Sequence, residues 1–436
     1  MADVRPLRGL RFNAQRYPDL SLLITPPYDI ISPEEQDLYY HRSSYSIIRL
    51  ELGQDLPGDT PQSNRYIRAA AILQGWLQDG VLVRDEKPTF YLVEHQFMYQ
   101  ERQQSRWGLM ARVRLEEPSQ GSIRPHEVIM REPYEDRTRL LETCRTNISP
   151  IMGLFQDPEG AVFDLLRSQV QGAPAQTGED TYGVSYRLWA IQDQDTLAQV
   201  SRLLAPKPIY IADGHHRYET ALSYSRRHPN PDGAPQFVLM TLTATQDPGL
   251  IILPTHRLVR GLEQRRIEQL EAALPQHFKM KRLSPTGSLS ETLQSWLAAL
   301  GEVGKGRAAF GLYGPYEDSM ALLVPKQVEA LRRTMPQEHP RSWKDLDVSL
   351  LHWVILRGML GLDGPEKEKA SLDYTRDGLE ALSRVRAGEC QMAFFLNPTP
   401  IEGLLAIADA SARMPQKSTY FHPKTATGLV LNPLWD

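Results

Sequence analysis

Residues 208–222 read PIYIADGHHRYETAL. The apolar run over 209–212 predicts a short strand, and the residues from Arg217 to about Arg227 predict a helix that ends before Pro229. Between them, Gly214 permits a sharp turn and a close approach of the backbone to a ligand. The stretch therefore predicts a strand, a tight turn and a helix in direct succession.

This turn has the chemistry of a phosphate-binding site. The first turn of a helix leaves amide groups unpaired and carries partial positive charge, so we expect phosphate to contact the backbone from Gly214 onward. Arg217 adds a guanidinium suited to two phosphate contacts, and His215 and His216 can donate to phosphate oxygens or move protons. Asp213, at the strand end, is placed to hold a metal or accept a proton. The alternative is an aspartate that caps the helix ahead of surface histidines.

A metal-dependent hydrolase is a further interpretation of the same residues. Glu219 follows His215 by four positions and can be added to His215 and His216 as a set of ligands. The repeated histidine spacing of a zinc helix is absent, so this interpretation is the least favoured of the three.

The rest of the chain alternates between helical and extended patterns. We expect helices from residue 33 and over 65–78, 134–144, 263–274, 289–300, 345–360 and 400–410, and strands over 45–52, 89–97, 107–115, 238–243, 250–253, 307–313, 320–324 and 392–396. Ser32 and Glu35 predict a capping box for the first helix, and Asn64 a cap for the helix from Arg65. The pattern indicates an α+β protein in two lobes, over residues 1–260 and 261–436.

Composition limits the partners. The 436 residues carry a net charge of −4, which gives no general attraction to nucleic acid or to anionic lipid. The two cysteines, Cys144 and Cys390, are too few for a disulfide framework, and no apolar run approaches the roughly 18 residues of a membrane span. We expect a cytoplasmic protein without a membrane or nucleic-acid partner, and the oligomeric state stays open.

Motifs spread over nearly the whole chain resemble the domain-of-unknown-function 1015 family. They lie at residues 26–31, 49–51, 126–127 with 136–137, 145–150, 213–220, 254–257, 397–399 and 414–419. The family is similar to the ParB and sulfiredoxin superfamily, in which nucleotide phosphates lie on the turn that matches Asp213–Arg217 here. The resemblance implies a ParB-like nucleotide-binding region over 1–260, with the C-terminal α/β lobe closing over its site.

Polar residues outside the turn gain candidate roles from this resemblance. Glu127, in a loop beside His126, is suited to take a proton from a substrate hydroxyl. The other candidates are phosphate contacts from Arg257, Lys417, Ser418 and Thr419, and substrate contacts from Tyr28, Asp29, His126 and Arg145. A solvated ion pair, a plain turn or a helix cap is the alternative at each position.

We therefore predict a nucleotide-dependent kinase that transfers a phosphoryl group to a small hydroxyl compound. The resemblance to free-serine kinases makes L-serine the leading acceptor and ATP or ADP the donor. Glu127, Asp213, His215 and His216 form the expected catalytic set, with Mg²⁺ bridging phosphate oxygens and held by Asp213. The alternatives are a nucleotide-binding switch without small-molecule turnover and the metal-dependent hydrolase.

Overall fold

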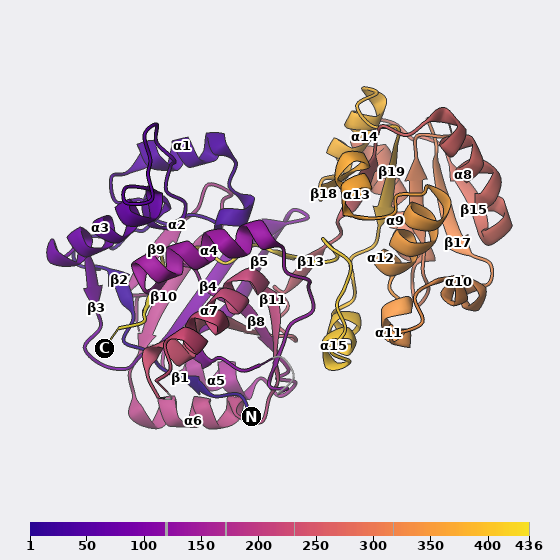
Figure 1. Ribbon diagram of the computed structural model, residues 1–436. Helices are drawn as coiled ribbons and strands as arrows, with labels where there is room; N and C mark the ends of the chain where they lie inside the picture. The colour runs from indigo at the N-terminus through magenta and orange to yellow at the C-terminus, as the bar shows by residue number, and fades with distance from the viewer. Residues whose placement is uncertain (118–120, 171, 231, 317, 436) are drawn as a thin grey trace. The chain divides into compact units, whose positions relative to one another are not determined.

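The computed structural model describes residues 1–117, 121–170, 172–230, 232–316 and 318–435. The chain divides into two compact units (Figure 1). Unit 1 consists of Met1–Pro125, Ile129–Ile251 and Phe421–Asp436, and unit 2 of His126–Val128 and Ile252–Tyr420. The units differ from the predicted lobes in that the last segment of the chain returns to unit 1.

Unit 1 is built on one large mixed sheet. Its strands, in spatial order, are β6 (Ile123–Arg124), β11 (Ile209–Asp213), β8 (Ile151–Phe155), β12 (Phe237–Ala244), β5 (Arg102–Arg114), β4 (Phe90–Tyr99), β10 (Ser185–Ile191) and β9 (Gln176–Glu179), and β1 (Val4–Arg5) also pairs with β5. The β6–β11 and β8–β12 pairs are parallel and the others antiparallel. Strands β8 and β12 are buried along their whole length, as expected for strands covered on both faces.

Helices and chain segments cover the two faces of this sheet with separate cores. The helices are α1 (Pro33–Arg42), α2 (Ile48–Glu51), α3 (Arg65–Gln78), α4 (Arg131–Cys144), α5 (Ala161–Ser168), α6 (Gln194–Leu204) and α7 (His215–Arg227). One core contains side chains of α5, α6 and α7, such as Val162, Val200 and Tyr218. The other contains Leu73 of α3 together with residues 429–431 of the C-terminal segment. The C-terminal segment is therefore part of a core of unit 1.

Two short strand pairs also belong to unit 1. Strand β2 (Leu10–Phe12) pairs with β3 (Leu82–Arg84), and β7 (Thr146–Asn147) pairs with β21 (Asn432–Pro433). The second pair joins the C-terminal segment to the residues that follow α4.

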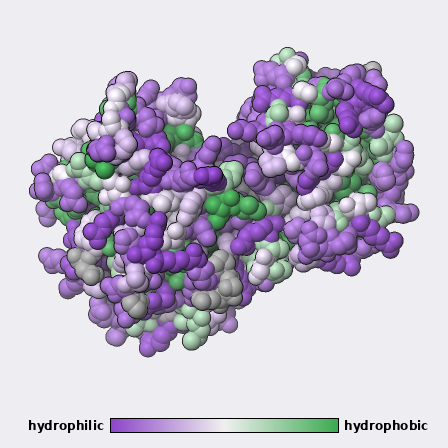
Figure 2. All heavy atoms as spheres, viewed as in Figure 1, coloured by the Kyte–Doolittle hydropathy of each residue, from purple (hydrophilic) through white to green (hydrophobic). Residues whose placement is uncertain are grey.

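Unit 2 has its own antiparallel sheet, in the order β15 (Phe278–Leu283), β17 (Met320–Pro325), β16 (Phe310–Tyr313), β19 (Met392–Leu396), β14 (His256–Val259) and β18 (Leu372–Thr375). Its helices are α8 (Gln264–His277), α9 (Leu289–Val303), α10 (Val328–Thr334), α11 (Arg341–Lys344), α12 (Asp347–Leu350), α13 (Pro365–Ser371), α14 (Gly378–Arg386) and α15 (Ile401–Asp409), with a π-helix over Leu351–Met359. Both units mix helices with sheets, which confirms the α+β class. Hydrophilic side chains dominate the face that Figure 2 shows.

Most of the predicted elements are present, and the caps are confirmed. Asn64 accepts hydrogen bonds from the first amides of α3, and Ser32 and Glu35 form the capping box of α1. The strand predicted over 45–52 is wrong, because residues 48–51 form the helical turn α2. The predicted helix over 345–360 is a short α-helix followed by the π-helix. No helix in the described part of the chain is long and apolar enough to cross a membrane.

Candidate phosphate site in unit 1

The predicted strand, turn and helix are all present. Strand β11 ends at Asp213, Gly214 has a φ of 93°, and α7 begins at His215. The positive φ favours glycine here, and a Cβ atom on Gly214 would lie 2.9 Å from the Nε of Arg217, so it would displace that guanidinium. The cap residue of α7 is Gly214, which has no side chain to accept from the first amides. Asp213 is thus not the helix cap, and the helix N-terminus keeps its capacity for an anion.

A shift in strand register sets the direction of Asp213. Ile211 pairs with Gly153 of β8, whereas Asp213 pairs with Met152, so β11 has one extra residue between them. Successive residues of β8 face opposite sides of the sheet. The irregularity therefore turns Asp213 to the side opposite that of Ile211, as strand bulges next to functional sites commonly do.

Two cations neutralise Asp213. Its Oδ2 lies 2.6 Å from Nη2 of Arg217, and its Oδ1 contacts the Nζ of Lys424. Burial alone would raise the pKa of Asp213, but the charges of Lys424 and Arg217 prevail and hold that pKa below its usual value. Arg217 also donates through Nη1 to the carbonyl of Pro150. Lys424 is not predictable from the local sequence, because it lies more than 200 positions along the chain from Asp213.

The donor set does not fit a metal ion bound directly to Asp213. Both carboxylate oxygens already contact a cation, so a divalent ion there would have to displace one of them. Among the residues that the structure describes, no three His, Cys, Asp or Glu side chains lie close enough to hold a metal. The predicted hydrolase set of His215, His216 and Glu219 is therefore not assembled.

The two histidines of the turn differ in environment. His215 is buried, with 4% of its surface exposed, and His216 is partly exposed. The Nε2 of His216 accepts a hydrogen bond of 2.8 Å from the backbone N–H of Met130. In this arrangement that nitrogen carries no proton, so it cannot also donate to a phosphate oxygen.

A buried acidic residue lies beside the turn. Glu51, at the end of α2, is 1% exposed, and its Oε1 accepts from the Oγ of Ser149 at 2.8 Å and from Nη1 of Arg137 at 3.2 Å. Burial raises the pKa of Glu51, and the nearby charges of Arg137 and Arg217 only partly oppose this rise. Glu51 and Arg137 lie in the family motifs at residues 49–51 and 136–137, and the sequence pattern predicts a role for neither.

A small cavity joins Glu51 to α7. It has a volume of about 40 Å³, and Glu51, Arg137, Ser149, Arg217 and Thr220 are among its lining residues. Within the described part of the chain, the buried Nε of Arg217 and Oγ1 of Thr220 have no hydrogen-bond partner. Buried donors without partners are unfavourable, and a space of this size holds about one water molecule. The cavity is therefore a polar site that a water or a ligand oxygen would complete.

The predicted substrate contacts of unit 1 are one residue that contacts the cluster around Glu51 and two that are exposed. Tyr28 begins a 3₁₀ turn, and the guanidinium of Arg137 lies 3.9 Å from the centre of its ring. Burial is the main cause that raises the pKa of Tyr28 to about 12, so its hydroxyl stays protonated. Asp29 is exposed, and Arg145 is an exposed left-handed residue with φ of 49° that ends α4. Only Tyr28 belongs to the cluster around Glu51.

The other predicted residues lie in unit 2. They are His126, Glu127, Arg257, Lys417, Ser418 and Thr419. Arg257 is buried and donates to the carbonyls of Gln416 and Lys417, at 3.4 and 3.2 Å. The Oγ of Ser418 donates to Pro415, and Thr419 lies 3.3 Å from His126. Arg257 and Ser418 thus stabilise the 414–419 loop through backbone contacts.

These features define an α+β protein with a glycine turn, a helix N-terminus and a buried cluster of opposite charges in one unit. The chain belongs to the family described as "Protein of unknown function (DUF1015)", whose profile matches residues 4–349, and the predicted membership is confirmed. No curated protein matches the chain.

Several solved structures show a distant similarity to this chain. A free serine kinase in complex with AMP is 12% identical, with 72% of this chain and 86% of that chain covered and a TM-score of 0.35. A conserved hypothetical protein from Pyrococcus furiosus is 14% identical, with coverage of 74% and 95% and a TM-score of 0.34. SbnI with a C-terminal truncation, from Staphylococcus aureus, is 10% identical, with coverage of 74% and 87% and a TM-score of 0.35.

Proposed function

We propose that unit 1 binds the phosphates of a nucleotide at the start of α7 and that the protein is a small-molecule kinase. The observation that carries this proposal is the Gly214 turn, where the helix N-terminus adjoins Arg217 and Lys424. Amides and guanidinium groups are the usual protein ligands of phosphate. A bound nucleotide supplies the phosphoryl group, while the turn supplies position and positive charge.

Glu51 is our candidate for the group that takes the proton of the acceptor hydroxyl. It is in the same unit as the turn, and it lines the same cavity as Arg217. Its raised pKa makes its carboxylate a better base than an exposed glutamate. Glu127, the base expected from the sequence, stays a prediction, and it lies in unit 2.

The proposal also includes a phosphoryl acceptor and a Mg²⁺ ion. Free L-serine stays the leading acceptor because of the family resemblance. A Mg²⁺ ion would bridge phosphate oxygens and take most of its remaining ligands from water, which this ion commonly retains. Asp213 would then act as the partner of Arg217 and Lys424 rather than as a metal ligand.

A turnover screen tests the proposal. ATP and ADP are offered separately with L-serine, pooled amino acids and pooled sugars in the presence of Mg²⁺, and nucleotide conversion is measured. We expect conversion by the wild type, little with Arg217→Ala, and a loss of about 100-fold or more with either Glu51→Gln or Glu127→Gln, whichever residue is the base. Equal activity in the wild type and Arg217→Ala would contradict the phosphate site.

The nucleotide-binding switch is the second candidate, because the turn needs no base in order to bind. It predicts that calorimetry detects ADP binding to the wild type and to Glu51→Gln alike, without conversion of any acceptor. Absence of ADP binding in the wild type would exclude both candidates.

A further inference from the structure

Asp136 is a polar residue that the proposed function leaves without a role. It lies in α4, next to Arg137, and a fifth of its side-chain surface is exposed. Its Oδ2 accepts from Nε of Arg137 at 2.7 Å and lies 2.5 Å from Nη2. Arg137, which is 6% exposed at its side chain, therefore lies between two carboxylates, Asp136 and Glu51.

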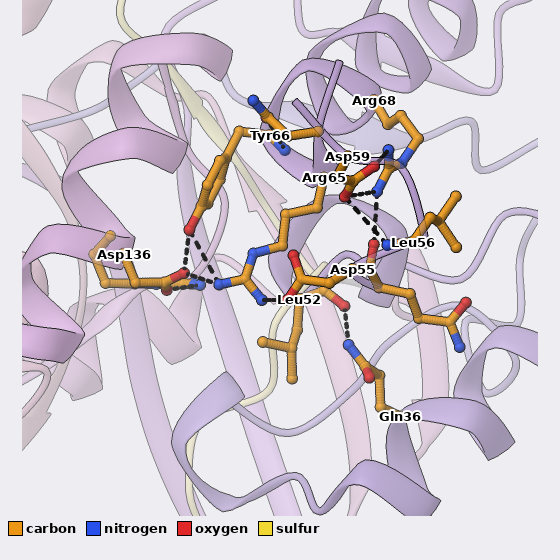
Figure 3. Close-up of polar contacts among 12 residues, drawn as sticks. Gln36, Leu52, Asp55, Leu56, Asp59, Arg65, Tyr66, Arg68 and Asp136 are labelled. Atoms are coloured by element: carbon orange, nitrogen blue, oxygen red, sulfur yellow. Dashed lines mark hydrogen bonds and ion pairs between the residues drawn. The ribbon is translucent and has the colours of Figure 1, made fainter. Parts of the chain in front are cut away.

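Two side chains of α3 hold the other oxygen of Asp136. Nη2 of Arg65 donates to Oδ1 at 2.6 Å, and the hydroxyl of Tyr66 donates to the same atom at 2.7 Å. Figure 3 shows both side chains converging on Asp136 from one helix. Both oxygens of Asp136 are thus fixed in charge-assisted hydrogen bonds, which are shorter and stronger than neutral ones.

The four charged groups form one alternating series. Arg65, Asp136, Arg137 and Glu51 carry positive, negative, positive and negative charges in that order, and each contacts the next. The outer end is accessible, because Arg65 and Tyr66 line a surface groove of about 760 Å³. The inner end is the buried carboxylate that lines the cavity beside α7.

We infer that Asp136 is a positioning residue for Glu51, that it acts through Arg137, and that Arg65 and Tyr66 fix its orientation. The inference rests on the proposed function, in which Glu51 takes the substrate proton. Nη1 of Arg137 contacts both the side chain and the backbone carbonyl of Glu51, so its placement governs the direction of that carboxylate. A misplaced catalytic group can lower a rate by about 100-fold without changing nucleotide binding.

The Asp136→Asn variant tests the inference in the full chain. ATP turnover with L-serine is measured against pH, and we expect kcat to fall about 10- to 100-fold while KM for ATP stays within about twofold. The charge of Asp136 raises the pKa of Glu51, so its removal should also move the acid limb of the kcat profile to lower pH. An unmoved acid limb overturns the inference.

Two matched variants distinguish the effect of the charge on Asp136 from the effect of its orientation. Tyr66→Phe removes one donor to Asp136 and keeps its charge, so we expect kcat several-fold lower with the acid limb in place. A wild-type kcat in this variant overturns the role of Tyr66. Glu135→Gln changes a neighbouring acid whose partner, Arg131, is exposed on the same helix, so both kcat and the acid limb should stay as in the wild type.

A double-mutant cycle tests the coupling between Asp136 and Glu51 without an activity assay. Melting temperatures are measured for the wild type, Asp136→Asn, Glu51→Gln and the double variant. Asp136 and Glu51 do not need to touch for their effects to be coupled through Arg137, so we expect non-additive shifts. Additive shifts overturn the inference, whereas absence of turnover in the wild type with non-additive shifts contradicts the proposed function alone.

Discussion

Asp213 carries one negative charge and contacts two positively charged side chains. Arg217 and Lys424 both pair with this one carboxylate, which therefore holds them in place. In the proposed function a bound phosphate would share the charge of these two cations with Asp213, and neither cation would lose its anion.

Loss of this carboxylate should destabilise unit 1. We expect Asp213→Asn to lower the free energy of unfolding at pH 7 by about 3–5 kcal/mol, because two buried cations lose their anion. Since the pKa of Asp213 is below its ordinary value of 3.8 in the folded chain, its stabilisation is complete above about pH 4 and disappears as pH falls through the folded pKa. Urea unfolding of the two proteins should thus differ most near neutral pH and converge in acid.

An exposed pair provides the control for this measurement. Asp164 and Arg167 lie 2.6 Å apart with 67% and 46% of their side chains exposed, so Asp164→Asn should cost less than about 1 kcal/mol. Equal losses in the two variants would show that the charge on Asp213 is as well solvated as a surface charge.

The local part of the candidate site is predictable from the sequence, whereas the distant part is not. Asp213, Gly214 and Arg217 are contiguous, so the strand, the turn and the basic side chain could be read together. Lys424 and Glu51 reach the same place only through tertiary packing, and a single chain has no local signal for such contacts. Glu51 was quoted within a motif, but its burial, which gives it chemical interest, depends on the whole unit.

Among the elements, the turn between β11 and α7 has the strictest sequence requirement. Gly214→Ala should lower the free energy of unfolding by about 1–2 kcal/mol for the backbone angle and further for the displacement of Arg217. It should also weaken ADP binding, because the guanidinium loses its position. Urea unfolding and calorimetry measure the two effects.

Gly58 offers a matched control in the same unit. Its φ of 91° is close to that of Gly214, but nothing lies within 4 Å of an added Cβ. Gly58→Ala should therefore show the backbone cost alone and leave ADP binding unchanged. If the two variants lose equal stability and affinity, the contact with Arg217 has no influence on the site.

Elements with a cap or a long apolar pattern were the most predictable. The helix over 65–78 begins and ends where the sequence predicts, because Asn64 provides an unambiguous cap. The segment 45–52 was misread because a short apolar run fits a strand and a buried helical turn equally well. Only packing decides between them, and here Ile48, Leu50 and Glu51 are all buried in a single helical turn.

At the scale of the whole molecule, the main segment of unit 2, Ile252–Tyr420, is an insertion within unit 1. The chain enters unit 2 after Ile251 and returns at Phe421, and the last segment adds both Lys424 and buried apolar residues to unit 1. The boundary predicted at residue 260 could not include this return, because the segment is short and has no strong periodicity. The segment from Phe421 directly follows unit 2 in the sequence, but it packs in unit 1.

Removal of residues 421–436 should unfold unit 1. Leu429, Val430 and Leu431 are at most 1% exposed, and each contributes about 1.5–3 kcal/mol when buried. Their sum approaches the whole stability of a typical domain. We expect loss of the unit 1 unfolding transition in urea, whereas Lys424→Met, which keeps the segment, should retain it. A truncated chain with wild-type unfolding would contradict this role of the segment.

The return of the chain also has a consequence for synthesis. On the ribosome, the Ile252–Tyr420 segment of unit 2 is made after Asp213 and before Lys424, so unit 1 lacks both β21 and Lys424 until that segment has been translated. Nascent chains that stop within unit 2 carry an unfinished core and an aspartate with one of its two cations missing. Such chains are natural targets for chaperones and proteases, and the proposed phosphate site is complete only after Lys424 has been translated.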